Sequence, residues 1–197
     1  MKSLITLTLL IGFIPMAHAE EDSGAPISFA VLKRATIGSY VLYMTSNKNQ
    51  PNVDPIDVSY TVVQKTASEV TLEMFTRTPR GPFVLQTVYA LQGSEAGKPL
   101  RARIKLGLNP PQDSPATGPR LASGLAHATV VEKENLPTEE AGRIDTTHYK
   151  RNNSDGTVTH MWMSDKVLPT GMVKTTDDSG NITMLVKYGT GSRSVMK

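Results

Sequence analysis

The sequence predicts a mainly β protein: one strongly curved antiparallel sheet, an unclosed barrel of about nine to eleven strands with a short helical or loop covering. The clearest observation is the stretch Thr157–Tyr188, where apolar and polar residues alternate in segments separated by Pro169, Gly171 and Ser179-Gly180. A second observation is that the connections between candidate strands are short, which favours hairpins over crossovers. Together they predict successive antiparallel strands with a buried face.

The N-terminus has the parts of a secretory signal peptide. Lys2 supplies a positive charge, Leu4–Met16 is an apolar run, and Ala17-His18-Ala19 supplies a cleavage pattern. The run is shorter than the about 20 residues that span a bilayer. We expect three parts in the chain, namely residues 1–19 (signal peptide), 20–26 (flexible leader) and 27–197 (a single β-rich domain). The mature protein is expected in the periplasm, with secretion as the alternative, and is not expected to span the membrane.

Composition narrows the function classes. The chain has no cysteine, so disulfides and thiolate metal sites are excluded. Lys2 is the only charged residue of the predicted signal peptide, so its removal leaves 20 Lys and Arg against 18 Asp and Glu, a net charge of +2. Nucleic-acid binding needs a concentrated basic face, and we therefore expect no nucleic-acid partner.

In the first two thirds of the domain the sequence predicts mainly strands. Residues 27–36 fit a short helix or an edge strand equally well. Tyr40–Met44 alternates in direction but is apolar on both faces, so each face is covered or one lines a cavity. The Pro-rich stretch 109–120 predicts an extended loop, either a lid or a disordered excursion. Further candidate strands are Ile56–Lys65, Glu69–Thr78, Phe83–Gln92, Leu100–Leu108 and Ala128–Lys133.

One later hairpin brings together two histidines. A three-residue loop, Ser154-Asp155-Gly156, puts His148, His160 and Trp162 on one face. A two-residue Asp-Gly turn would instead put the histidines on opposite faces. A zinc site needs a third protein ligand, and no Asp or Glu is expected to converge on this pair. We therefore predict no metal and no cofactor, and, since the chain lacks a nucleophile motif such as G-x-S-x-G, no catalytic residues.

Methionines on the predicted strands have two interpretations. They line a pocket for a flexible apolar ligand, or they simply fill the core of the protein. In the last strand we expect Ile182, Met184, Val186 and Tyr188 to share one core-facing side. The predicted lining for a lipid or acyl chain on the concave face is Leu42, Met44, Leu72, Met74, Leu106, Trp162 and Met184.

Near the C-terminus, the order of a strand, a corner and a hairpin resembles that of a known protein family. The residues concerned are Trp162, Asp165, Pro169, Gly171, Asp177 and Gly180. They resemble the closing section of the periplasmic lipoprotein-carrier (LolA-like) superfamily over about a third of the chain. The corner here reads L-P-T-G where that family has T-G-L-P, and the family's lipid-contacting residues have no match in the N-terminal half. The resemblance implies an unclosed barrel whose concave face binds acyl chains or docks a partner.

Two functions from different classes follow. We expect an exported cell-envelope binding protein, not an enzyme, that holds a lipid or the acyl part of a lipoprotein on the concave face. The alternative is a structural or interaction component of an envelope complex, which meets its protein partner through an edge strand or residues 109–120. A continuous apolar cavity of roughly 300 Å³ or more supports the first, and a packed interior the second. A metalloenzyme would require a carboxylate beside His148 and His160 in a cleft.

Overall fold

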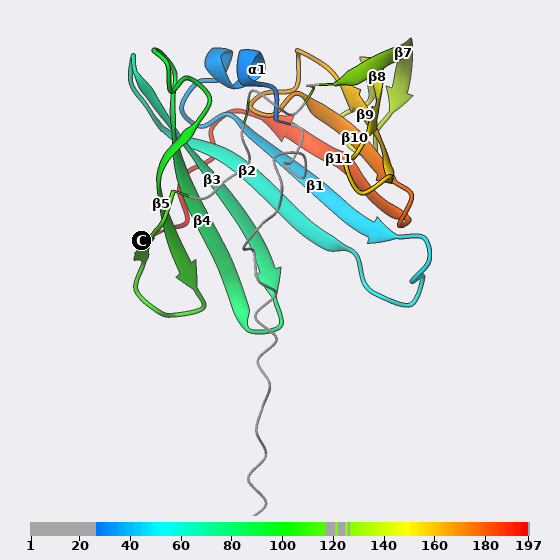
Figure 1. Cartoon of the computed structure of the whole chain (residues 1–197). Coiled ribbons are helices and arrows are strands. Elements are labelled where there is room, and N and C mark those ends of the chain that lie inside the picture. Colours follow the sequence, from blue (N-terminus) through cyan, green and yellow to red (C-terminus); the bar gives the residue numbers. More distant parts are fainter. Residues whose placement is uncertain (1–26, 117–120, 122–124, 126, 197) are drawn as a thin grey trace, which may run out of the picture.

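The structure of the chain is a computed structural model that describes residues 27–116, 121, 125 and 127–196. That part contains one short helix and eleven strands (Figure 1). In chain order the elements are α1 (Phe29–Arg34), β1 (Tyr40–Asn47), β2 (Ile56–Lys65), β3 (Glu69–Thr78), β4 (Gly81–Ala90), β5 (Pro99–Leu106), β6 (Gln112–Ser114), β7 (Ala128–Pro137), β8 (Arg143–Asn152), β9 (Val158–Met163), β10 (Met172–Asp177) and β11 (Asn181–Gly189). The predicted signal peptide, the predicted leader and residues 117–120 of the Pro-rich stretch lie outside the described residues.

All eleven strands belong to one antiparallel sheet, which confirms the predicted fold class. Their order is β6-β5-β4-β3-β2-β1-β11-β10-β9-β8-β7, so the first strand pairs with the last. Among the described strands β6 and β7 are the two edges, and the sheet does not close into a barrel. Within the described residues, no helix has the length and apolar character needed to cross a membrane.

The segment that fits either a helix or an edge strand by sequence is helical. The Ser28 side chain accepts a hydrogen bond from Val31 N at 3.4 Å, and Lys33 and Arg34 lie in the last turn. Both features stabilise a helix end. The helix packs on one face of the sheet through a buried cluster of Ile27, Leu32, Ala35, Val62, Val70, Leu72, Tyr89, Leu91 and Leu121. We call the face that α1 covers the inner face, and the opposite one the outer face.

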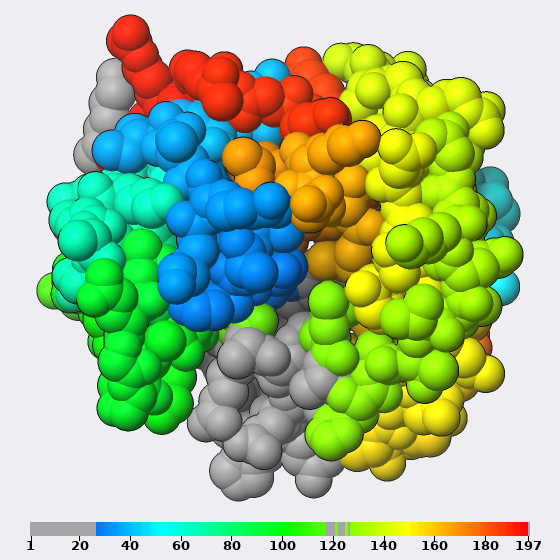
Figure 2. Space-filling model, turned by 90° about the horizontal axis from the view of Figure 1, so that it is seen from above, coloured from blue at the N-terminus to red at the C-terminus, as the bar shows by residue number. Residues whose placement is uncertain are grey.

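The sheet curves around α1. In Figure 2 the helix (blue) lies between the cyan and green strands on one side and the yellow strands on the other. In β1, Val41 and Tyr43 are fully buried on the inner face while Leu42 and Met44 are half-buried on the outer face, as alternation requires. A second buried cluster consists of Val41, Tyr43, Ile144, Met161, Met163, Val167, Met172, Val173 and Leu185.

The last strand departs from the predicted alternation. Leu185 is fully buried and pairs with Tyr43, so the half-buried Met184 points to the outer face. Val186 falls where the register with β1 shifts, and this bulge returns Tyr188 to the inner face. The prediction that alternate residues of this strand share one core-facing side is therefore wrong, because the bulge changes the side partway along the strand.

Two other segments extend the sheet or lie on it. Gln112–Ser114, within the Pro-rich stretch predicted as a loop, forms the short edge strand β6 beside β5. After β11 the chain runs back along the outer face. There Ser192 N donates to Gly38 O at 3.1 Å, and Val195 N donates to the Glu73 carboxylate at 2.9 Å. The C-terminal segment therefore covers part of the outer face of β3.

Candidate functional site

A cavity of about 610 Å³ lies between α1 and the β7–β8 hairpin, on the inner face. Part of its wall is apolar, formed by Val31, Leu125, Tyr149 and Met163. The rest of the lining is polar and includes Lys133, Asn135, Asp145 and Asp165. Nine of the fourteen described lining residues are polar or charged, Glu134 among them, and the volume lies within the usual range of small-molecule sites, about 300–1,000 Å³.

The corner between β9 and β10 holds α1 beside this cavity. Ser28 N donates to Thr170 O at 2.9 Å, which ties the start of the helix to the corner. Gly171 has a φ of +82°, and a Cβ there would lie 3.1 Å from Val31 Cγ2. A residue with a side chain would be strained in this backbone and would push against the helix. The corner thus fixes the position of α1, which forms one side of the cavity.

The register distributes the seven predicted lining residues over both faces of the sheet. The inner face carries Leu72, Met74 and Leu106, and the outer face carries Leu42, Met44, Trp162 and Met184. Leu72 packs in the core cluster under α1. None of the seven is among the described residues that line the 610 Å³ cavity. Met163 and Tyr149, which do line it, were not predicted because they stand next to residues that we placed on the concave face.

The outer face carries a compact aromatic and polar group. Asn153 N donates to Thr157 O at 2.8 Å and Gly156 has a φ of +82°, which confirms the three-residue loop. His148 therefore pairs with Trp162, and His160 lies on the same face. The His148 and Trp162 rings are stacked, with centroids 4.3 Å apart and planes at 10°. His148 Nε2 and His160 Nδ1 are 2.9 Å apart.

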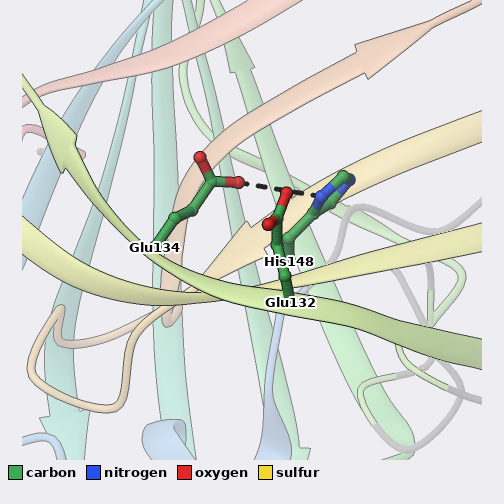
Figure 3. A group of neighbouring side chains, drawn as sticks. All are labelled: Glu132, Glu134 and His148. Carbon is green, nitrogen blue, oxygen red and sulfur yellow. Dashed lines mark ion pairs between the residues drawn. The ribbon is translucent and has the colours of Figure 1, made fainter.

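Two carboxylates from β7 reach the same group, so the expectation that none converges on the histidines is wrong. Figure 3 shows Glu132 and Glu134 pointing toward His148. Glu134 Oε1 lies 3.7 Å from His148 Nδ1 and accepts a hydrogen bond from Trp162 Nε1. A bulge between Val130 and Glu132 sets this register. Two acids at positions 132 and 134 share one face of any strand, and this period of two is the signal that could have found them.

Electrostatics keep His148 neutral near pH 7. The residue is 8% exposed, and this burial is the main cause that lowers the pKa of its imidazole. The neighbouring His160 and, more weakly, Lys174 lower it further, while Glu134 and Glu132 raise it. Lys174 Nζ lies 4.6 Å from the centroid of the Trp162 ring, a cation–π contact. The neutral imidazole therefore offers the lone pair of a ring nitrogen to a ligand.

No family model matches this chain, and no curated protein matches its sequence. Among solved structures, a hypothetical protein from Chlamydia trachomatis is 10% identical, with a TM-score of 0.52 over 85% of this chain and 94% of that one. The two chains share a fold. A putative lipoprotein from Parabacteroides distasonis is 13% identical, with a TM-score of 0.41 over 78% of this chain and 96% of that one. PNGF-II is 12% identical, with a TM-score of 0.34 over 79% of this chain and 29% of that one.

Proposed function

We propose that this protein is an exported cell-envelope protein that binds a lipid or acyl chain on the inner face of its sheet. The observation that carries the proposal is the cavity of about 610 Å³ between α1 and the β7–β8 hairpin. Its volume exceeds the roughly 300 Å³ that a small-molecule site needs, and its mainly polar lining includes an apolar part formed by Val31, Leu125, Tyr149 and Met163. The ligand lies in this cavity and not across the seven residues predicted from sequence, since those residues are divided between two faces.

The lining suits a molecule with an apolar and a polar part. Tyr149 and Met163 offer apolar surface to an acyl chain, and burying each methylene group contributes about 0.8 kcal/mol. Lys133 offers a positive charge to an anionic headgroup. Asp145 accepts hydrogen bonds from Asn135 Nδ2 at 2.8 Å and from Lys166 Nζ at 3.2 Å, and it adds an exposed polar group at the rim.

The proposal that the protein is exported rests on its sequence. The predicted signal peptide directs the chain across the inner membrane, and the C-terminal third resembles the periplasmic lipoprotein-carrier superfamily. The corner that carries this resemblance is the one that holds α1 beside the cavity. The function is one of binding, not catalysis.

The test is mass spectrometry of an organic extract from the mature protein, purified from the periplasm without detergent. An unrelated exported protein, purified in parallel, controls for carried-over membrane lipid. We expect near-stoichiometric lipid from this protein alone. An extract without lipid, together with failure to bind apolar fluorescent probes, contradicts the proposal.

Two matched variants locate the ligand. Thr147→Phe places a bulky side chain in the cavity, opposite Met163. Leu42→Phe places the same side chain on the outer face. We expect Thr147→Phe to lose most of the bound lipid and Leu42→Phe to retain it. Equal retention in both variants would contradict the cavity as the site.

A second function is favoured by one observation on the sheet edge. The strand β7 is an edge among the described strands, and Val130 and Val131 on it are 57% and 50% exposed. An exposed apolar edge strand can pair with a strand of another protein. If the extract holds no lipid, we propose instead an envelope interaction component that docks through β7. A Val131→Lys variant would then lose its partner in cross-linking within the periplasm.

A further inference from the structure

We propose that Glu132, Glu134 and His148 form a binding site for a divalent transition-metal ion of the Zn²⁺ class. The three residues come from the paired strands β7 and β8, and one ligand atom from each lies within 4.8 Å of the others. Ligand atoms around a tetrahedral Zn²⁺ are about 3.4 Å apart. Glu132 is exposed, so its side chain can rotate toward the other two ligands without moving the sheet, while the Trp162 indole holds Glu134.

The hydrogen bonding of His148 points to a cation. Its Nδ1 is buried and has no hydrogen-bond partner among the described residues, although it faces Glu134 at 3.7 Å. That distance is too long for a hydrogen bond. Its other nitrogen, Nε2, lies 2.9 Å from His160 Nδ1. When Nε2 carries the proton and donates to His160, Nδ1 has a lone pair that points toward two carboxylates. A metal ion at this point would bind the imidazole nitrogen and both carboxylates together.

The neighbours of the three ligands hold them in place. His160 Nδ1 lies within hydrogen-bond distance of His148 Nε2 and orients the ring, in the way that a second hydrogen-bonded group commonly orients a ligating imidazole. Trp162 stacks on the His148 ring and donates its indole N–H to Glu134.

The donor set defines the class of ion. Carboxylate oxygens combined with an imidazole nitrogen suit Zn²⁺ and similar first-row ions, whereas Ca²⁺ and Mg²⁺ prefer oxygen ligands alone. The chain has no cysteine to select softer ions. Three protein ligands leave one coordination position open to water or to a donor from a bound molecule.

The test is isothermal titration calorimetry of the untagged mature protein, freed of metal by a chelator, with Zn²⁺ and with Mg²⁺. We expect one Zn²⁺ per chain and no saturable Mg²⁺ binding. Glu132→Gln should weaken Zn²⁺ binding at least tenfold, and Glu139→Gln, an exposed acid in the loop between β7 and β8, should leave it unchanged. Wild-type protein that does not bind Zn²⁺, or an unchanged affinity in Glu132→Gln, would overturn the proposal.

A spectroscopic readout places the ion at this site. Trp162 is the single tryptophan of the chain and stacks on His148, so bound Co²⁺ should quench its fluorescence and show the visible absorption of a tetrahedral complex. His148→Gln should abolish both signals. If that variant is poorly folded by circular dichroism, Glu134→Gln serves in its place, because its amide oxygen can still accept from the indole. Co²⁺ signals that persist in Glu134→Gln overturn the assignment.

Discussion

The indole of Trp162 lies nearly flat on the imidazole of His148, at a centroid distance of 4.3 Å and an angle of 10°. The same indole donates to Glu134, so one side chain connects β9 with the two strands beyond it on the outer face. A stacked pair of this kind contributes about 0.5–1.5 kcal/mol beyond the area it buries. This contact adds a side-chain link to the backbone pairing of β8 with β9.

Trp162→Leu should therefore destabilise the protein more than Trp162→Phe. Phenylalanine keeps a ring against His148 and loses the bond to Glu134, while leucine loses both contacts. We expect Trp162→Phe to cost about 1–2 kcal/mol of unfolding free energy and Trp162→Leu about 1 kcal/mol more. Urea denaturation followed by circular dichroism measures the difference. Equal losses in the two variants would show that the stacking contributes nothing.

Gly171→Ala and Gly156→Ala form a matched pair. Both glycines have a φ of +82°, so both alanines carry the left-handed cost of about 1–2 kcal/mol. A Cβ at Gly171 would lie 3.1 Å from Val31 Cγ2, whereas a Cβ at Gly156 meets no atom of the described residues within 4 Å. We expect Gly171→Ala to cost about 1–3 kcal/mol more in urea denaturation. Similar losses of unfolding free energy in the two variants would mean that α1 moves away from the added methyl group at no cost in stability.

Removing the hydroxyl of Tyr43 should destabilise the protein, because this hydroxyl links β1 to the β9–β10 corner. The hydroxyl donates to Met172 O at 2.8 Å and contacts Thr170 Oγ1, and Tyr43 is fully buried. Tyr43→Phe removes a buried hydrogen bond to a backbone carbonyl and should cost about 1–3 kcal/mol. A double-mutant cycle with Thr170→Val measures the coupling, which we expect to be favourable. Strict additivity would exclude a hydrogen bond between the two side chains.

Glu73 should hold the C-terminal segment on the outer face. Its carboxylate is 2% exposed and accepts hydrogen bonds from Val195 N at 2.9 Å and from the Ser194 hydroxyl at 2.6 Å. Hydrogen bonds to a charged group contribute about 1.5–3 kcal/mol. We expect Glu73→Ala to speed hydrogen exchange at Val195 and trypsin cleavage at Arg193. Glu69→Ala, which removes an exposed pair with Arg101, is the control and should change neither rate.

Stability should fall at alkaline pH because of buried tyrosines. Burial raises the pKa of Tyr60 to about 12, and it also raises the pKa values of Tyr43 and Tyr89. Above the ordinary value of 10.0 the unfolded chain releases phenolic protons that the folded chain keeps, so unfolding becomes more favourable as pH rises. Urea denaturation between about pH 8 and 11 measures the slope, which Tyr60→Phe should reduce. Native-state titration of Tyr60 at its ordinary value, followed by absorbance, would contradict the prediction.

Local pattern predicted much of the sheet because strand alternation and hairpin chemistry are properties of neighbouring residues. The bounds of Ile56–Lys65 and Glu69–Thr78 match β2 and β3. Gly156 closes the three-residue loop that brings His148 and His160 to one face. Local pattern does not distinguish the inner from the outer face of β1, since both of its faces are apolar.

The sequence by itself therefore determined the class of fold and the order of most strands, and it left two registers open for the histidine hairpin, one of which the structure has. Only the tertiary structure decided which residues meet across strands far apart in the chain. The bulge at Val186 puts Met184 and Tyr188 on opposite faces. The bulge before Glu132 brings two acids to His148, and the docking of α1 on the corner at Gly171 bounds the cavity. Each of these depends on register shifts and on packing between distant segments, which short-range periodicity does not encode.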